Sequence, residues 1–332
     1  MMKIKIFLIT IFCIIESNSF AEDSSFEKWL VDFKKNAMSK GISITTLDTV
    51  LADVKYLPNV IKYDRYQPEF YEDTKTYVTK RTSNKKLNNG ILLYSKNKDL
   101  INKVEKKFNV EKELLLALMG IETNFGKYLG KMDIISSLAT LSYDKRRSAF
   151  FTNELITILK LIDNDIIDYK TLYGSWAGAF GNFQFMPTTI KKYALDYDRN
   201  NQINLKSIED SFASAANYIN SIGWINENPC FIKVDLNKNI PLEYLNTSAK
   251  KIKSKKKFKH LKKYIINSES ININENLYAA VITPDKDIVP DSEILKPAFV
   301  VFNNYELILK WNRSLRFALA VCTLKDNFKN EL

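Results

Sequence analysis

A single histidine among 332 residues excludes several kinds of catalytic site. A Ser-His-Asp triad, a Cys-His pair and a multi-histidine zinc site would each depend on His260. That residue lies in a run of lysines from Lys255 to Lys263, which is typical of a solvated basic face. Any enzymatic chemistry must therefore rest on other groups.

Cysteine is also scarce, with Cys13, Cys230 and Cys322 as the complete set. Cys230 and Cys322 are too few and too far apart to indicate a disulfide scaffold, and the sequence leaves open whether they pair. Cys13 follows Phe12 inside an apolar run, where a lipidated cysteine would follow a small residue. We therefore do not expect a lipid anchor.

The apolar run from Ile6 to Ile15 is the longest candidate for a membrane segment, and it is too short to span a bilayer. Lys3 and Lys5 precede it, and small residues at Ser19 and Ala21 form a cleavage pattern. We predict that residues 1–21 are a signal peptide. The mature chain is then exported to the periplasm, with no transmembrane segment.

The chain carries a formal net charge of +11 with 45% hydrophobic and 26% charged residues, an ordinary globular composition. Because export makes a nucleic-acid partner unexpected, acidic wall polymers or membrane head groups are the better match for this charge. The basic stretch Lys250–Lys263 holds nine lysines and reads as helix-like. It fits either adhesion to such a surface or a solvated helix face, and we favour the second.

Helical spacing of apolar residues dominates the chain, with strand-like alternation only after Pro229. We predict a mainly α (α+β) fold. Its parts are a signal peptide (1–21), an N-terminal helical region (22–110), a catalytic core (111–227), a mixed or β insertion (228–303) and a C-terminal helix that returns to the core (304–332).

Glu122 is the acid whose surroundings point to catalysis. In the expected helix 111–122, Leu115, Leu118 and Met119 lie seven, four and three residues before it and share its face. A carboxyl group among hydrocarbon is hard to ionise, so we expect a raised pKa, as a general acid needs near neutral pH. The alternative is a glutamate at a helix end that points to water.

Three segments carry recognisable motifs, and the first contains Glu122. They are Gly120–Gly126, Gly174–Pro187 and Trp311–Ser314 with Phe317. Together they resemble the lytic murein transglycosylase B family, glycoside hydrolase family 103, over most of the chain from Asp64 to Leu324. The resemblance implies a lysozyme-like helical core and a monomeric enzyme that acts on peptidoglycan glycan strands. Whether other cell-wall enzymes are partners is left open.

The resemblance implies cleavage between N-acetylmuramic acid and N-acetylglucosamine, with a 1,6-anhydromuramyl end as product. Glu122 would act first as acid and then as base, so no second carboxylate and no cofactor are required. Substrate contacts or support of Glu122 are implied for Ser175, Gln184, Phe185, Met186, Tyr218, Trp311, Asn312, Phe317, Arg146 and Arg147. A hydrolytic muramidase and a non-catalytic wall-binding protein remain the alternatives.

Some of these residues also fit a plainer interpretation. Tyr218 could equally be a core aromatic, and Arg146 and Arg147 could be ordinary surface charge rather than partners of the muramyl peptide stem. The family more often has tyrosine at the positions of Trp311 and Phe317, so a hydrogen bond made by the family's hydroxyl group is missing at Phe317.

Oxygen-bearing side chains two residues apart in the segment 196–202 are typical of a calcium loop. The resemblance implies a structural calcium ion at this place, closed by a later acid. Asn201 replaces the usual glycine, but asparagine tolerates the left-handed backbone. The predicted ligands are Asp196, Asp198, Asn200, Gln202 and Asp210; a calcium-free turn is the alternative.

Overall fold

The computed structural model describes residues 25–67 and 70–332. The predicted signal peptide and Cys13 lie outside these residues. By contact the chain forms two compact units, each built from separate segments. The first comprises residues up to Arg65 with 129–192 and 199–204, and the second comprises 66–128, 193–198 and 205–332. The domain boundaries given above stay a prediction.

The first unit is helical around a short strand pair. Helices α8 and α9 pack together, and α2 and α3 pack on them. Helix 25–39 adds an aromatic cluster in which Phe26 contacts Trp29 and Tyr143. The other elements are α2 (Ile44–Val50), α3 (Pro58–Arg65), β1 (Met132–Asp133), α8 (Ile134–Tyr143), α9 (Ser148–Asp163), β2 (Tyr173–Gly174) and α10 (Pro187–Tyr193).

The second unit has a helical part centred on α7 (Lys112–Thr123), in which every residue from Leu114 to Gly120 is buried. Helix α14 (Leu315–Lys329) packs against it. A methyl group on Gly120 would lie 2.8 Å from the ring of Phe125 and 3.3 Å from Leu324 of α14, so the packing around this glycine is close. The remaining helices are α4 (Thr74–Arg81), α5 (Asn84–Lys96), α6 (Lys98–Phe108), α11 (Ile208–Ser221) and α13 (Asn303–Trp311).

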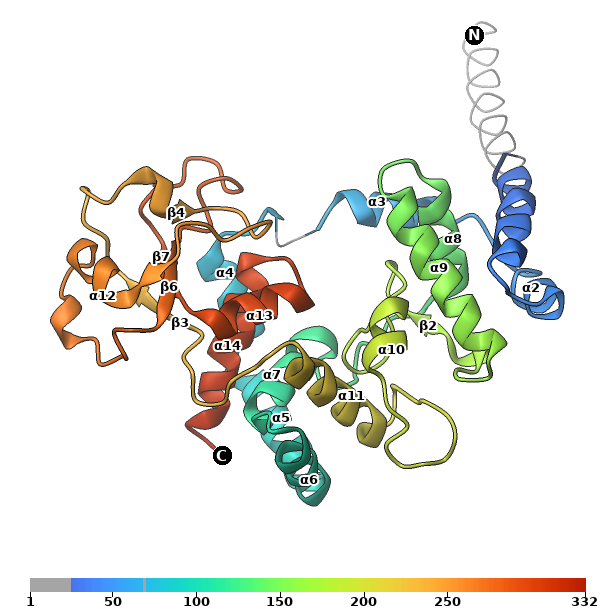
Figure 1. The fold of residues 1–332 in the computed structure, drawn as a ribbon, viewed down its shortest axis with the longest axis horizontal. Helices are drawn as coiled ribbons and strands as arrows, with labels where there is room; N and C mark the ends of the chain where they lie inside the picture. Colours follow the sequence, from blue (N-terminus) through green and yellow to red (C-terminus); the bar gives the residue numbers. More distant parts are fainter. Residues whose placement is uncertain (1–24, 68–69) are drawn as a thin grey trace, which may run out of the picture. The chain divides into compact units, whose positions relative to one another are not determined.

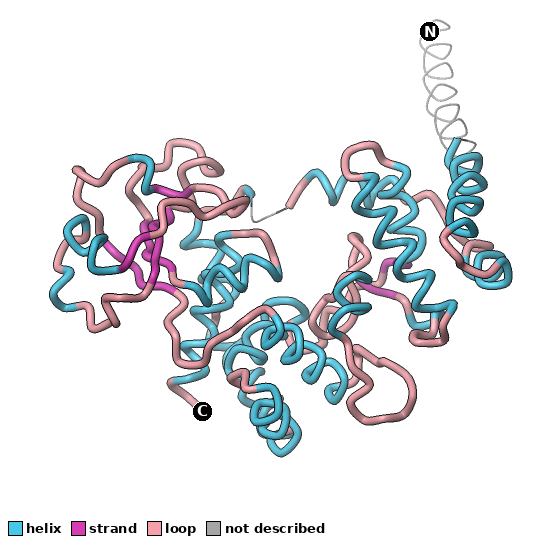
Figure 2. Tube along the Cα trace, viewed as in Figure 1, coloured by secondary structure: helices cyan, strands magenta, loops and turns pink. Residues whose placement is uncertain are grey.

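A mixed sheet with strand order β3-β7-β6-β4 forms the rest of the second unit, and β5 pairs with β6. Its strands are β3 (Phe231–Val234), β4 (Leu245–Asn246), β5 (Lys256–Lys257), β6 (Tyr278–Ile282) and β7 (Ala298–Val301). Figure 2 shows these strands gathered in one place. Val281, Val300 and Phe258 are central to the core beneath. The mainly α prediction with strands in 228–303 is confirmed.

The helix-like interpretation of 250–263 is wrong for most of that stretch. Lys256 and Lys257 form strand β5, and α12 covers only Phe258–Leu261, followed by a 3₁₀ turn. Phe258 and Leu261 are buried in the sheet core while the lysines around them are not. Burial of two apolar residues, rather than helix propensity, decides the conformation here.

The single C-terminal helix expected within 304–332 is two helices, α13 and α14, separated at 312–314. Ser314 ends the break by accepting a hydrogen bond from the Phe317 amide and so begins α14. Cys230 and Cys322 form a disulfide, with their Cα atoms 6.1 Å apart, which ties α14 to the start of the sheet segment. In residues 25–67 and 70–332, no helix has the length and apolar character to cross a membrane.

Candidate active site

Glu122 is partly buried in the last turn of α7, on a helix whose other faces are packed. Leu115, Leu118 and Met119 on its side of the helix are buried, as the spacing indicated. Helix α7 ends in three successive left-handed residues, Asn124, Phe125 and Gly126, with φ of 50°, 61° and 78°. Such a conformation costs free energy in non-glycine residues, and it clusters at functional sites.

A lysine from α5 closes the carbonyl end of α7. Lys86 Nζ donates to the Gly120 carbonyl at 2.6 Å, where a positive charge complements the helix dipole. Burial, aided by the nearby charge of Arg81, lowers the pKa of Lys86. The end of the helix that carries Glu122 is thereby held by a side chain as well as by packing.

Trp311 contacts Glu122 directly. Its indole Nε1 donates to Glu122 Oε1 at 2.9 Å, across 189 residues of sequence. The indole ring stacks on Tyr218 at 5.0 Å between ring centroids, and Tyr218 stacks on Tyr193 at 4.4 Å. Trp311, where the family more often has tyrosine, therefore still donates a hydrogen bond to Glu122.

Tyr218 fits both interpretations that the sequence left open, a core aromatic residue and a residue that supports Glu122. It is buried like a core residue, yet it supports the ring that contacts Glu122. Its hydroxyl donates to the Lys310 carbonyl at 3.1 Å, just before Trp311. Burial, with a smaller effect of Tyr193, raises the pKa of Tyr218 to about 12, so the phenol stays neutral at physiological pH.

Asn312 is partly exposed in the break after α13, directly after Trp311. Phe317 is buried in α14, with 3% of its surface exposed. Their substrate roles remain predictions. The side chain of Phe317 packs within the protein.

In the first unit, Gly174–Pro187 forms a compact turn segment. Ser175 Oγ accepts from the Ala179 amide at 3.0 Å, and the Ser175 amide donates to the Ala179 carbonyl at 2.9 Å. Glycine is required at two places, because a methyl group on Gly174 would lie 2.2 Å from the Ala179 oxygen and one on Gly178 would strike Leu138. The turn therefore presents backbone and small side chains.

The end of this segment holds the other predicted substrate residues. Gln184 is left-handed, with φ of 50°, and its Nε2 donates to the carbonyls of Gly181 at 2.9 Å and Leu129 at 3.3 Å. Phe185 is buried and exchanges backbone hydrogen bonds with Phe180, while Met186 is partly exposed.

A buried acid that the sequence reasoning did not single out fixes the following helix. Glu154 on α9 is 2% exposed, and its carboxylate accepts from the Thr188 amide at 2.8 Å and the Thr188 hydroxyl at 2.7 Å, at the start of α10. Burial raises the pKa of Glu154, against the lowering effect of the two bonds. Its signal in the sequence was an acid among the apolar residues of helix 148–163.

Arg146 and Arg147 converge on one buried carboxylate. Arg146 Nε donates to Asp64 Oδ2 at 2.7 Å, and Arg147 donates to Asp64 Oδ1. The Asp64 side chain is fully buried, whereas the two arginine side chains are 45% and 39% exposed. The arginines are thus anchored at one end and accessible to solvent.

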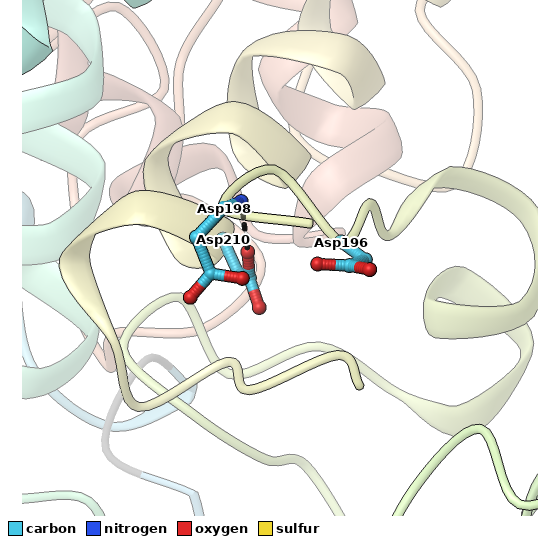
Figure 3. Close-up of side chains that lie close together, drawn as sticks. All are labelled: Asp196, Asp198 and Asp210. Carbon is cyan, nitrogen blue, oxygen red and sulfur yellow. Dashed lines mark hydrogen bonds between the residues drawn. The ribbon is translucent and has the colours of Figure 1, made fainter. Parts of the chain in front are cut away.

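Asp196, Asp198 and Asp210 of the second unit form a group of carboxylates whose oxygens lie within 4.8 Å of one another (Figure 3). Asp210 is fully buried near the start of α11 and accepts from the Tyr197 amide at 2.7 Å. Three acids this close repel one another unless a cation joins them, and oxygen ligands are those that calcium prefers. The donor set therefore fits the ion.

The other two predicted ligands belong to the segment 199–204 of the first unit, where Asn200 Oδ1 accepts from the Gln202 amide at 2.9 Å. Asn201 has φ of 70°, which confirms that it takes the left-handed conformation of the glycine it replaces.

The fold and the site together define a class, a mainly α protein of the lysozyme-like kind with one glutamate at the end of a buried helix. Residues 25–326 match the SLT_2 family, Transglycosylase SLT domain, and the chain belongs to this family. The resemblance drawn from the motifs is thereby confirmed.

Individual relatives agree with this assignment. Membrane-bound lytic murein transglycosylase B of Escherichia coli (strain K12) is 37% identical over 138 residues, which make up 41% of this chain but only 38% of that protein. SltB3 from Pseudomonas aeruginosa, solved in complex with NAG-NAM-pentapeptide, has 30% identity and a TM-score of 0.80, covering 92% of this chain and 79% of its own.

The fold is also shared with the Escherichia coli lytic transglycosylase Slt35, solved in complex with calcium. Its identity is 24% and its TM-score 0.75, over 91% of this chain and 93% of its own.

Proposed function

We propose that this protein is a peptidoglycan lytic transglycosylase. It cleaves the β-1,4 bond between N-acetylmuramic acid and N-acetylglucosamine and leaves a 1,6-anhydromuramyl end. The observation that carries this function is the placement of the family motif Gly120–Gly126. Its one acid, Glu122, lies at the end of a buried helix and accepts a hydrogen bond from an indole N–H.

The related SltB3 supports the substrate class, because it has been solved with NAG-NAM-pentapeptide and with NAG-anhNAM-pentapeptide. The second of these ligands carries an anhydro sugar.

In the proposed reaction, the Glu122 carboxylic acid gives its proton to the glycosidic oxygen as the bond to muramyl C1 breaks. The muramyl 6-hydroxyl oxygen then attacks C1 and loses its proton to the Glu122 carboxylate, which restores the acid. The substrate's N-acetyl group stabilises the cationic centre between these steps. Because the nucleophile belongs to the sugar, the nucleophilic carboxylate of a retaining glycosidase is unnecessary.

Trp311 orients the acid for both proton transfers. Its N–H fixes Oε1 of Glu122 at 2.9 Å, and the aromatic stack behind it limits movement of the indole. Such preorganisation matters because proton transfer is sensitive to distance and alignment. Asn312 next to it would bind a hydroxyl or N-acetyl group of the sugar.

The first unit would supply sugar and peptide contacts. Ser175 and Gln184 offer polar atoms beside closely approachable backbone, and the partly exposed Met186 provides apolar surface, whereas Phe185 is buried. Arg146 and Arg147 would bind carboxylates of the peptide stem through guanidinium groups that Asp64 holds in place.

The test is digestion of purified sacculi by wild type and by Glu122→Gln, with mass spectrometry of the products. We expect anhydro ends, which lack one water relative to hydrolysis products, and a loss of roughly 10²–10⁴-fold in turnover for the variant. Hydrated ends would instead identify a muramidase. A wild type without activity, or a variant that keeps its full biological effect, would identify a wall-binding protein.

Three further features belong to the proposal. Asp196, Asp198 and Asp210 would hold a structural calcium ion that takes no part in the chemistry. The protein would act in the periplasm after removal of residues 1–21, which N-terminal sequencing of the exported protein tests. It would act as a monomer, which its sedimentation or light scattering tests.

A further inference from the structure

A basic hollow of about 570 Å³ lies in the sheet part of the second unit, and none of its lining residues belongs to the candidate active site. We name it the lysine hollow. It is lined by Tyr244, Lys256, Lys257, Lys259, His260, Lys263 and Tyr278. Figure 1 labels α12, which carries Lys259 and His260, and β6, which carries Tyr278.

The hollow is held in shape by the sheet core. Strand β5 carries Lys256 and Lys257 and pairs antiparallel with β6, where Lys257 lies opposite Tyr278. Phe258 and Leu261 are 0% and 1% exposed and anchor the short helix that follows. Lys259 and His260 of this helix and Lys263 of the 3₁₀ turn after it all line the hollow. The basic groups are therefore displayed by an anchored frame.

The charge of the hollow is not neutralised from within. Among the residues that the structure describes, Lys256, Lys257, Lys259 and Lys263 make no ion pair, whereas the adjacent Lys255 and Lys262 are paired with Glu306 and Glu275. Like charges gathered in one concave place repel one another, and a bound anion removes that repulsion.

Aromatic rings are interleaved with the lysines. Lys256 Nζ lies 5.0 Å from the ring centre of Tyr244, and Tyr278 is 64% exposed beside it. An exposed tyrosine ring is a platform for the apolar face of a sugar, and its hydroxyl group can bond to sugar oxygens. A contact with a flat bilayer does not require a hollow.

We propose that the lysine hollow is a second, non-catalytic binding site for an anionic glycan, a sugar chain that bears several carboxylates. On the proposed function, that polymer is peptidoglycan, whose stem peptides carry free carboxylates. The hollow holds the enzyme on the wall while Glu122 cleaves elsewhere on the polymer. Two attachments on one polymer raise the effective concentration of the catalytic site there.

The test uses sacculus binding in a Glu122→Gln background, so that the polymer survives the measurement. The hollow variant carries Lys256→Gln, Lys257→Gln, Lys259→Gln and Lys263→Gln. The control removes the same charge from exposed lysines of the same unit outside the hollow, with Lys238→Gln, Lys250→Gln, Lys251→Gln and Lys253→Gln. Both are compared with the parent at about 0.15 M salt, where the Debye length is ~8 Å.

We expect about tenfold weaker binding for the hollow variant, since four exposed ion pairs together contribute about that much. The control should weaken binding by less than about twofold, because its lysines do not line the hollow and exposed charges outside it are partly screened by salt. Tyr278→Ala should also weaken binding, although it changes no charge. Equal weakening by hollow and control variants would overturn the site, and so would no weakening by the hollow variant.

Two further arms identify the ligand and separate this site from the catalytic function. Glycan stripped of its peptide stems should bind the parent more weakly. Removal of the four lysines should weaken binding to phosphatidylglycerol vesicles less than it weakens binding to sacculi, although exposed lysines attract any anionic surface to some extent. Dependence on the lysines for vesicles alone would overturn the glycan in favour of a membrane. With Glu122 intact, the hollow variant should cleave short soluble glycan fragments normally. If no form cleaves them while sacculus binding still needs the lysines, the proposed function fails and the site stands.

Discussion

Trp311→Phe isolates the one hydrogen bond that orients the proposed acid. Phenylalanine keeps an aromatic ring to stack on Tyr218 but removes the Nε1 donor that lies 2.9 Å from Glu122 Oε1. A hydrogen bond to a charged group contributes about 1.5–3 kcal/mol. If the bond is made in the transition state, kcat should fall by about 10–100-fold, with little change in KM.

The measurement is the rate of release of anhydromuramyl products from sacculi, at several pH values. Tyr218→Phe is the matched control, because it removes the bond to the Lys310 carbonyl and leaves the stack and the Glu122 contact in place. We expect the control to lose only a few-fold in kcat. A Trp311→Phe enzyme that turns over at the wild-type rate, with an unchanged melting temperature, would refute a role for Trp311 in orienting the acid.

The remaining predictions concern groups that support the site. Glu154→Ala should lower the free energy of unfolding by about 1–3 kcal/mol, because Thr188 loses its acceptor at the start of α10. Burial raises the pKa of Glu154 above 4.5, so its contribution to stability should be fully present below that pH and be lost as pH rises through the pKa of the folded protein. Urea unfolding of wild type and of Glu154→Gln across this pH range measures the stability of wild type relative to the variant. A relative stability that grows with pH would contradict the prediction. Asp64→Asn should raise KM for glycan with peptide stems but not for stripped glycan, since it frees Arg146 and Arg147 from their anchor; equal effects on both substrates would argue against a stem contact. Calcium at about 100 times its Kd should stabilise the protein by ~2.7 kcal/mol in thermal unfolding, and chelation should reverse this. Asp198→Asn should abolish the effect, whereas a shift that persists in Asp198→Asn would place the ion elsewhere.

Sequence reasoning reached the features that are encoded over a few residues. The helix that carries Glu122 follows from apolar spacing within 12 residues. The left-handed Asn201 was likewise recognisable from the spacing of its neighbours. The prediction from short-range spacing was wrong where burial decided the conformation. Because Phe258 and Leu261 are buried in the sheet core, the expected helix is strand β5 and a single helical turn.

The amino-acid sequence by itself determined the class of fold, the family and the identity of the proposed acid, because periodicity and motifs are properties of neighbouring residues. Only the tertiary structure decided what touches what over long separations. Trp311 reaches Glu122 across 189 residues, and Cys230 meets Cys322 across 92. Such contacts depend on how helices and strands pack, and local patterns do not specify that packing. The lysine hollow arises in the same way, because a strand pair and a buried helical turn bring four lysines to one surface.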